Sequence, residues 1–147
     1  MAVRPAEPAD AVVVTELVEA AYQGYVPRIG LRPAPMDADY ASLIARGMVS
    51  VAEQAGAVVG VLVLFIADDH LLIENIAVSP ASQGAGVGSL LMQTAEQHAR
   101  EAGVRQVRLY THELMAENHS YYRHRGFVET HRAVADGFAR VFFTKQL

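Results

Sequence analysis

An uninterrupted apolar run, AVVGVLVLFIA from Ala57 to Ala67, is the feature that most restricts the fold. The run is too short to cross a bilayer, because a transmembrane helix needs about 20 apolar residues. Its many β-branched residues favour a strand, and a strand covered on both faces has this continuous apolar pattern. We therefore expect Val58 to Ile66 to be a strand inside a sheet that is covered on both sides.

Turn sequences on either side of this run indicate further strands. Ala55-Gly56 and Asp68-Asp69 are the expected turns of an antiparallel meander. A helix that follows the meander and ends at Gly103 then crosses over to the next strand. The further strands are expected at Met48–Gln54, His70–Val78, Val104–Thr111, Phe127–His131 and Arg140–Lys145. The sequence therefore predicts an α/β fold with a mixed central sheet.

The helices predicted by the apolar spacing are amphipathic. The first begins near the N-cap candidate Asp10, the second spans Asp37 to Arg46, and a short one spans Ala116 to Arg125. The irregular stretch from Arg28 to Pro35 is expected to be the loop between the first two. The apolar faces are Val14, Leu17, Val18 and Ala21 in the first helix, Tyr40, Leu43 and Ile44 in the second, and Leu90, Leu91, Ala95, Ala99 and Ala102 in the helix after Gly88.

Size and composition limit the class of protein. A chain of 147 residues is expected to form a single domain, residues 1–147. The absence of cysteine excludes a disulfide scaffold and fits a reducing compartment. The N-terminal MAVRPAEPAD lacks the apolar core of a signal peptide, so we expect a cytoplasmic protein without a membrane segment. The net charge of -4 argues against nucleic acid as a partner, because such surfaces need clustered Lys and Arg.

The segment QGAGVGS, residues 83–89, places three alternating glycines between a strand that ends at Val78 and a helix that begins near Val87. Backbone N–H groups at a helix N-terminus have no intrahelical partner, and the helix dipole favours negative charge there. Glycines let an anion approach this backbone closely. Tight turns alone explain one or two glycines, but three at this place favour a cradle for a pyrophosphate.

Two nucleotide-binding motifs fit this segment poorly. A mononucleotide P-loop requires a Lys and a Ser or Thr after its last glycine, whereas Gly88 is followed by Ser89 and Leu90. A dinucleotide fingerprint requires GxGxxG after the first strand of a doubly wound sheet. Counted from Gly84, its third glycine falls on Ser89, and the motif lies in mid-chain behind a meander.

The same residues carry a resemblance to a known family. Gln83 to Gly88 match the QxxGxG signature of the GCN5-related N-acetyltransferase (GNAT) family, and Tyr122 to Phe127, YRHRGF, resembles the family's YxxxGF. The resemblance covers nearly the whole chain, including a first strand that contains Arg4. It implies the GNAT-like fold of an acyl-CoA N-acyltransferase, with a mixed, mostly antiparallel sheet of six to seven strands flanked by helices.

The resemblance also implies an activity and a donor. The activity is transfer of an acetyl group from acetyl-coenzyme A to a primary amine of a small molecule or peptide, without a metal. By resemblance, the glycine loop holds the pyrophosphate, and the strand that ends at Val78 binds the pantetheine arm, which enters between that strand and Val104–Thr111. The cofactor-binding residues it implies are Ile76, Ala77, Val78, Gln83, Gly84, Ala85, Gly86, Val87, Gly88, Ser89 and Asn118.

Tyr122 occupies the family's tyrosine position and is the predicted proton donor to the leaving thiolate, a group with a reference pKa of about 8.5. Helical spacing places Asn118 and Met115 on the same face as Tyr122. Many relatives have an Asn seven residues before this tyrosine, where this chain has Met115. The alternative for Tyr122 is a core aromatic whose hydroxyl reaches water.

The general base is open among four residues. Glu74 lies on the cofactor strand, shares a face with Ile76 and Val78 by alternation, and would have a raised pKa if partly desolvated. Its alternative is an ordinary salt bridge or a solvent-facing position. The other candidates for the base are His112, Glu113 and Glu117, just after the next strand.

The remaining polar residues suggest no further site. His70 is expected to be exposed at a turn, and Arg123 and Arg125 are typical of a solvated face. The histidines show no metal-binding spacing backed by carboxylates, so we predict no metal.

Three functions remain open at this stage. They are a catalytic acetyltransferase, a coenzyme A binding or sensing module without turnover, and a nucleotide-binding oxidoreductase. Acceptor specificity is expected in the N-terminal helices, the stretch from Arg28 to Pro35 and the segment from Val134 to Phe138. Relatives often form homodimers, an assembly that the sequence neither supports nor excludes.

Overall fold

The computed structural model describes residues 1–147, which form a seven-stranded sheet of order β1-β2-β3-β4-β5-β7-β6. All neighbouring strands are antiparallel except β4 and β5, which are parallel. The prediction of a mixed, mostly antiparallel sheet is confirmed, and the doubly wound alternative is wrong. The strands are β1 (Ala2–Pro5), β2 (Val49–Gln54), β3 (Ala57–Ile66), β4 (Leu71–Val78), β5 (Gln106–His112), β6 (Val128–Ala135) and β7 (Phe138–Gln146).

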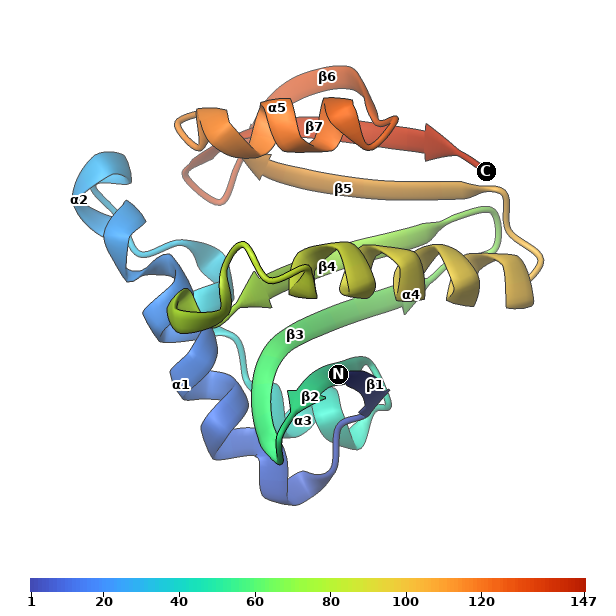
Figure 1. Ribbon diagram of the computed structural model, residues 1–147. Helices are drawn as coiled ribbons and strands as arrows, with labels where there is room; N and C mark the ends of the chain where they lie inside the picture. The colour runs from blue at the N-terminus through green and yellow to red at the C-terminus, as the bar shows by residue number, and fades with distance from the viewer.

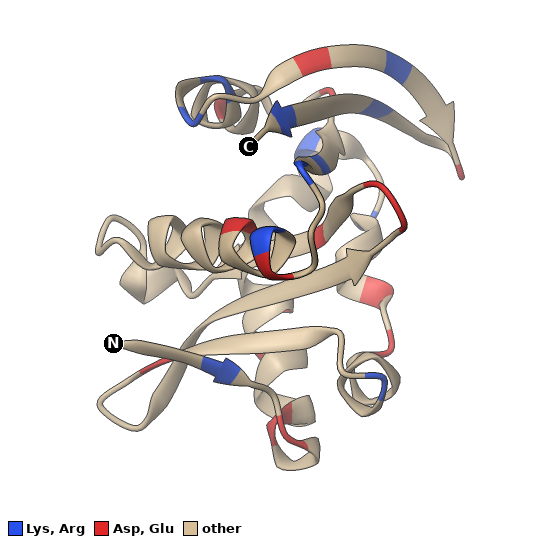
Figure 2. Ribbon diagram, turned by 90° about the vertical axis from the view of Figure 1, so that its right-hand side faces the viewer, with Lys and Arg blue, Asp and Glu red and all other residues tan.

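Five α-helices accompany the sheet (Figure 1). They are α1 (Ala11–Tyr22), α2 (Val26–Ile29), α3 (Tyr40–Ala45), α4 (Val87–Glu101) and α5 (Ala116–His124). Short 3-10 turns occupy Pro8–Asp10, Gln23–Tyr25, Ala34–Asp37 and Pro80–Ser82. No helix combines the length and the apolar character needed to cross a membrane. Figure 2 shows acidic and basic residues interspersed along the chain.

Each face of the sheet has its own apolar core, and β3 contributes to both. Val61 and Val63 pack with α1 and α3, whereas Leu62 and Leu64 pack with α4 and the aromatic residues around α5. The expectation that this strand is covered on both sides is therefore confirmed. The predicted apolar faces of the helices are also largely confirmed, although Ala102 is exposed.

Three local predictions near the N-terminus need correction. Asp10 occupies the predicted N-cap position of α1, but its side chain makes no capping hydrogen bond, because its carboxylate accepts from Arg4 at 2.8 Å and from the Glu7 amide at 2.7 Å. The second predicted helix begins only at Tyr40, where Asp39 caps it. The predicted loop from Arg28 to Pro35 contains the end of α2 and the start of a 3-10 turn.

Pairing between the two parallel strands ends early. β4 pairs with β5 only over Leu71–Ile73. The pairing of β4 with β3 skips Glu74, which is therefore the extra residue of a β-bulge. A bulge bends its strand and increases the local twist. Beyond Ile73, β4 and β5 diverge, as Figure 1 shows, and the edge of β4 that carries Ile76–Val78 has no neighbouring strand.

Gly60 of β3 lets the start of α4 lie directly on the sheet. A Cβ atom at this position would lie 2.7 Å from Cγ1 of Val87 and 2.9 Å from Cδ1 of Leu91. Both distances are too short for real carbon contacts. The absence of a side chain at Gly60 therefore fixes how closely the first turns of α4 approach β3.

We predict that Gly60→Ala lowers the free energy of unfolding by about 1–3 kcal/mol, because an added methyl group overpacks this contact. Gly24→Ala is the matched control, since a Cβ there has no atom within 4 Å. It should change the free energy of unfolding by less than about 0.5 kcal/mol. Urea unfolding of both variants measures the difference, and equal stabilities would contradict the role given to Gly60.

Candidate active site

The segment before α4 presents a row of backbone amides without protein acceptors. Gly84 and Gly86 adopt left-handed conformations, with φ of 83° and 85°. The first helical hydrogen bond runs from the Leu90 amide to the Gly86 carbonyl, and the Ala85 amide donates to Ser82. The amides that find no acceptor in the protein belong to Gln83, Gly84, Gly86, Val87, Gly88 and Ser89. These N–H groups are therefore free to bind an anion at the N-terminus of α4.

These amides line an open groove of 490 Å³, which we call the loop groove. Its other walls are β4 at Ile76, Ala77 and Val78, and the side of α5 that carries Asn118 and Tyr122. Every residue that the sequence assigned to cofactor binding lines the loop groove except Ala85. The sequence analysis gave no site role to Ala21, Tyr22, Tyr25, Ser82 and Tyr121, which also line it, and named Glu117 only as a candidate base.

Tyr122 lies where the loop groove meets a second, smaller cavity. Its ring is 7% exposed and packs against Phe127 and Phe143. Its hydroxyl has no hydrogen-bond partner in the protein, and the residue lines both cavities. Burial raises the pKa of Tyr122 well above its ordinary value, so the hydroxyl keeps its proton at neutral pH. Tyr122 is thus a core aromatic residue whose protonated hydroxyl has no protein partner and whose side chain borders both cavities.

The second cavity, the inner cavity, lies in the opening between β4 and β5 and has a volume of 70 Å³. Ile29 and the stretch Pro33–Pro35 close its other side. Its lining is mainly apolar, and apart from tyrosines its ionisable side chains are those of Glu74, His112 and Arg140. Tyr22, Ile76, Asn118 and Tyr122 line both cavities and therefore mark their junction.

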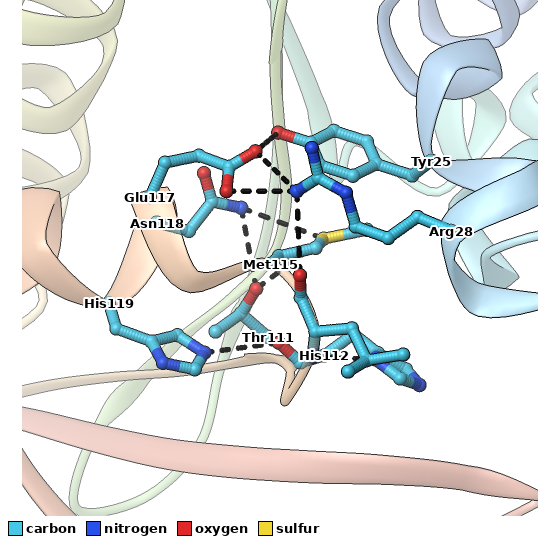
Figure 3. Close-up of polar contacts among 9 residues, drawn as sticks. Tyr25, Arg28, Thr111, His112, Met115, Glu117, Asn118 and His119 are labelled. Carbon is cyan, nitrogen blue, oxygen red and sulfur yellow. Dashed lines mark hydrogen bonds and ion pairs between the residues drawn. The ribbon is translucent and has the colours of Figure 1, made fainter.

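Asn118 is held at this junction by the start of α5 (Figure 3). Its amide nitrogen lies 3.4 Å from Oγ1 of Thr111 and 3.6 Å from Sδ of Met115. Met115, Asn118 and Tyr122 all line the inner cavity, so the predicted common face is confirmed. The two contacts of the Asn118 nitrogen leave its carbonyl oxygen free to accept a hydrogen bond from a bound molecule.

Glu74 lies at the inner cavity, but its orientation differs from the prediction. Because it is the extra residue of the bulge, simple alternation fails there. Ile76 and Val78 pack against the α4 core, whereas Glu74 faces the opposite side of the sheet. The side chain is exposed, and its Oε2 accepts a hydrogen bond from the Tyr110 hydroxyl at 3.4 Å. Burial raises the pKa of Tyr110, and the Glu74 carboxylate adds to this effect.

His112 is a poor candidate for the base in this geometry. The Leu114 amide donates to Nδ1 of His112 at 3.0 Å, so this nitrogen carries no proton and Nε2 must carry one in the neutral ring. Burial lowers the pKa of His112, which favours that neutral form. His112 therefore keeps a free donor, its Nε2–H, and no free ring acceptor.

The two other candidate bases have ionic partners. Glu113 accepts a hydrogen bond from Arg132 at 3.1 Å and lines neither cavity. Glu117 accepts from Arg28 at 2.9 Å and from the Tyr25 hydroxyl at 2.7 Å (Figure 3). The Tyr25 hydrogen bond is the main reason why the pKa of Glu117 is lowered, and a hydrogen bond from the backbone amide of Glu117 and the Arg28 guanidinium lower it further. Through these contacts Glu117 links α5 to Tyr25 and Arg28, just before and in α2, beside the loop groove.

A series of partly buried side-chain hydrogen bonds supports the inner cavity. No sequence pattern indicated it. The Tyr22 hydroxyl donates to Oδ1 of Asn75 at 2.7 Å, and the Asn75 amide donates to the Tyr40 hydroxyl at 3.0 Å. The Tyr40 hydroxyl in turn donates to the Pro35 carbonyl at 2.6 Å. The series therefore ties α1, β4 and α3 to the stretch that closes the cavity.

Outside the two cavities, one predicted surface residue proved to have a partner in the glycine loop. Arg125 donates from Nη1 to Oγ of Ser89 at 2.9 Å and faces the buried Glu96 at 4.0 Å. It is therefore a partly buried link between α5 and α4, not a solvated residue. His70, expected to be exposed, is also partly buried, and its Nδ1 lies 2.7 Å from Oδ1 of Asp69. The structure contains no group of three or more His, Cys, Asp or Glu side chains placed to hold a metal ion.

Together, the diverging parallel pair and the amide cradle before α4 define an acyl-CoA N-acyltransferase fold, as comparison with known proteins bears out. The Acetyltransferase (GNAT) family model matches residues 14–127. Since this match covers most of the chain, the protein belongs to the GNAT acetyltransferase family, and the resemblance found in the sequence is confirmed. The comparison with curated protein sequences finds no match.

Solved structures of other acetyltransferases share this fold. The paia N-acetyltransferase from Thermoplasma acidophilum, in complex with coenzyme A, is 16% identical and aligns over 99% of this chain and 98% of its own with a TM-score of 0.84. A GCN5-related N-acetyltransferase from Rhodopseudomonas palustris is 25% identical over 99% and 95%, with a TM-score of 0.81. An Elizabethkingia anophelis GNAT acetyltransferase with acetyl-CoA bound is 18% identical over 99% and 97%, with a TM-score of 0.74.

The buried tyrosines lead to a prediction about pH and stability. Burial raises the pKa of Tyr40 to about 12 and the pKa values of Tyr22 and Tyr122 well above the ordinary value. Above pH about 10 the unfolded chain loses tyrosine protons that the folded protein keeps. The stabilisation is therefore fully present below pH 10 and is lost progressively as the pH rises above it.

Urea midpoints measured from pH 8 to pH 11 test this expectation. They should stay level to about pH 10 and then fall, and Tyr40→Phe should make the fall shallower. Midpoints that stay level to pH 11 would contradict it.

Proposed function

We propose that residues 1–147 form one N-acetyltransferase domain that moves an acetyl group from acetyl-coenzyme A to a primary amine of a small molecule or peptide. One observation carries the proposal: the uncapped amides of the glycine loop open into a groove that leads to Tyr122 and the inner cavity. A donor and an acceptor that enter from opposite sides would meet at this tyrosine.

The loop groove fits the chemistry of coenzyme A. The free amides between Gln83 and Ser89, at the positive end of the α4 dipole, suit a pyrophosphate. The unpaired edge of β4 at Ile76–Val78 offers backbone groups to the amides of the pantetheine arm. The arm would thus take the place of a neighbouring strand and point its thioester at the junction of the two cavities.

The chemistry requires two proton movements. The neutral amine attacks the thioester carbon, so an N–C bond forms and, after a tetrahedral intermediate, the C–S bond breaks. The departing sulfur takes a proton, and Tyr122 is the proposed donor because its hydroxyl is protonated and has no other partner. The amine loses a proton, and keeping a lysine-like amine neutral at pH 7 costs about 4–5 kcal/mol without help.

Glu74 is the proposed acceptor of the amine's proton, directly or through water. It is the only carboxylate that lines the inner cavity, and none of the ion pairs includes it. Tyr110 holds it by a hydrogen bond at 3.4 Å. The carboxylate would attract the acceptor's ammonium group and then take its proton.

We predict that Gly88→Asp weakens coenzyme A binding by about 100-fold, because it places a negative charge beside the proposed pyrophosphate. The apo protein should be as stable as the wild type or slightly more so, since Asp suits the first turn of a helix better than Gly. A Cβ at Gly88 lies 3.5 Å from the Tyr121 hydroxyl, an ordinary contact.

Gly88→Asn is the matched control for added bulk without charge, and it should cost about tenfold or less in affinity. Calorimetric titration with coenzyme A gives both affinities. Wild-type affinity in the Asp variant would show that residues 83–89 do not hold the pyrophosphate.

Tyr122→Phe should lower kcat by about 10²- to 10⁴-fold, the usual contribution of a positioned acid. The affinity for coenzyme A should change little, because the hydroxyl acts on the leaving sulfur. Tyr121→Phe removes the neighbouring hydroxyl in the loop groove and should cause a much smaller loss.

Release of free thiol with acetyl-coenzyme A and a panel of amines measures turnover in these variants. An unchanged rate in the Phe variant would refute the acid assignment. Coenzyme A binding without turnover on any amine would instead indicate a non-catalytic binding module.

A further inference from the structure

Arg140 stands apart from the other arginines of the protein. Every other partly exposed arginine has a carboxylate partner, and the two remaining unpaired ones, Arg46 and Arg105, are exposed. Arg140 is only partly exposed, lines the inner cavity and makes no hydrogen bond or ion pair within the protein. Its guanidinium lies over the Tyr110 ring, 4.4 Å from the ring centre. A positive charge in a mainly apolar cavity is therefore left without a direct ion-pair partner.

His112 adds a second donor on the same wall. It pairs directly with Arg140 across the β5–β7 ladder, so both side chains leave the same face of the sheet. Since Nδ1 of His112 accepts from Leu114, its Nε2 carries the proton that can be donated. A guanidinium beside an imidazole N–H is a recognised arrangement for binding a carboxylate.

The negative charge of the cavity lies on the other side of the same tyrosine. The Tyr110 hydroxyl reaches Glu74, while its ring supports Arg140. The Glu74 carboxylate and the Arg140 guanidinium thus both contact Tyr110, one at its hydroxyl and the other at its ring. Their separation is therefore limited to about the length of this side chain plus the two contacts. A small molecule that carries both an ammonium and a carboxylate would neutralise both charges at once.

We infer that the acceptor is an amino acid with a small apolar side chain, its carboxylate on Arg140 and His112 and its amine on Glu74. This inference rests on the proposed acetyltransferase function and narrows its acceptor. The small volume of 70 Å³ and the apolar lining by Ile29, Leu109 and Phe138 suit such a side chain. A polyamine would leave Arg140 facing a second positive charge, and a longer peptide would place its carboxylate far from its amine.

A comparison of matched acceptors tests this assignment. Alanine, valine and leucine are each assayed beside their carboxamides, which keep the shape and remove the negative charge, and putrescine is added as a dication. Thiol release with acetyl-coenzyme A and the mass of the product are measured. The free acids should have kcat/KM values about 10- to 100-fold above those of the carboxamides. Amine basicity cannot create this order, because the carboxamide has the less basic and more easily deprotonated amine.

Variants of Arg140 test whether this residue causes the preference for free amino acids over their carboxamides. Arg140→Gln should bring the ratio of acid to carboxamide close to one by raising KM for the acids, and Arg140→Lys should restore part of it. Arg105→Gln is the matched control, since Arg105 is exposed and lines neither cavity. It should keep the wild-type ratio. Unchanged coenzyme A affinity in all three variants shows that each is folded.

The outcomes separate this inference from the function on which it rests. Equal or better use of the carboxamides or putrescine would overturn the inference and leave the acetyltransferase function intact. Failure to bind coenzyme A at all would refute the function itself. If no amine is turned over, calorimetry of the amino acids in the presence of coenzyme A decides. Binding that Arg140→Gln abolishes supports the inference, and absence of binding overturns it.

Discussion

The early end of the β4–β5 pairing is the constraint on which the site depends. A parallel pair that continued along β4 would fill the space of both cavities with main chain, and it would satisfy the edge that carries Ile76–Val78. The pairing stops at Ile73, where the bulge at Glu74 bends β4 while its pairing with β3 resumes beyond the bulge. One extra residue therefore opens the sheet without breaking it, and it also places its own carboxylate at the opening.

The position of α4 is the second requirement, and it depends on a glycine far from any ligand. Gly60 lets Val87 and Leu91 rest on β3, so the helix N-terminus is held close to the free edge of β4. The backbone amides of the glycine loop before α4 lie close to protein groups, yet most of them donate no hydrogen bond to the protein. Unpaired backbone donors in a buried site would destabilise the fold, but an open groove lets water replace an anion when none is bound. The loop is therefore compatible with a stable apo protein.

Much of this arrangement can be predicted from the sequence, because it depends on local patterns. The apolar β3 run indicates a covered strand, the glycines at 84 and 86 indicate left-handed turns, and the spacing of Tyr122 places it on the face of α5 that carries Asn118. A bulge is different, since it is set by the register between two strands and not by the residue that occupies it. Alternation therefore gave the wrong face for Glu74.

Tertiary partners were equally hidden from sequence patterns. In the sequence, Arg140 looks like any charged residue of a strand near the edge of the sheet. Only the structure shows that it lines the inner cavity and has no carboxylate partner. Arg125 resembled a solvated residue until its contact with Ser89 was seen. The tautomer of His112 follows from a single amide two residues later in the chain, and only coordinates show that hydrogen bond.

The division between proton donors and acceptors around the junction argues for the proposed roles. Four tyrosines lie at or beside the inner cavity, and burial raises the pKa of every one; they are Tyr22, Tyr40, Tyr110 and Tyr122. Their hydroxyls hold their protons at neutral pH, and the neutral His112 holds its proton on Nε2. Glu74 is then the one carboxylate of the cavity, and it is the group proposed to accept the amine's proton. Among the four hydroxyls, those of Tyr22, Tyr40 and Tyr110 already donate to protein oxygens, which leaves that of Tyr122 free to donate to a leaving group.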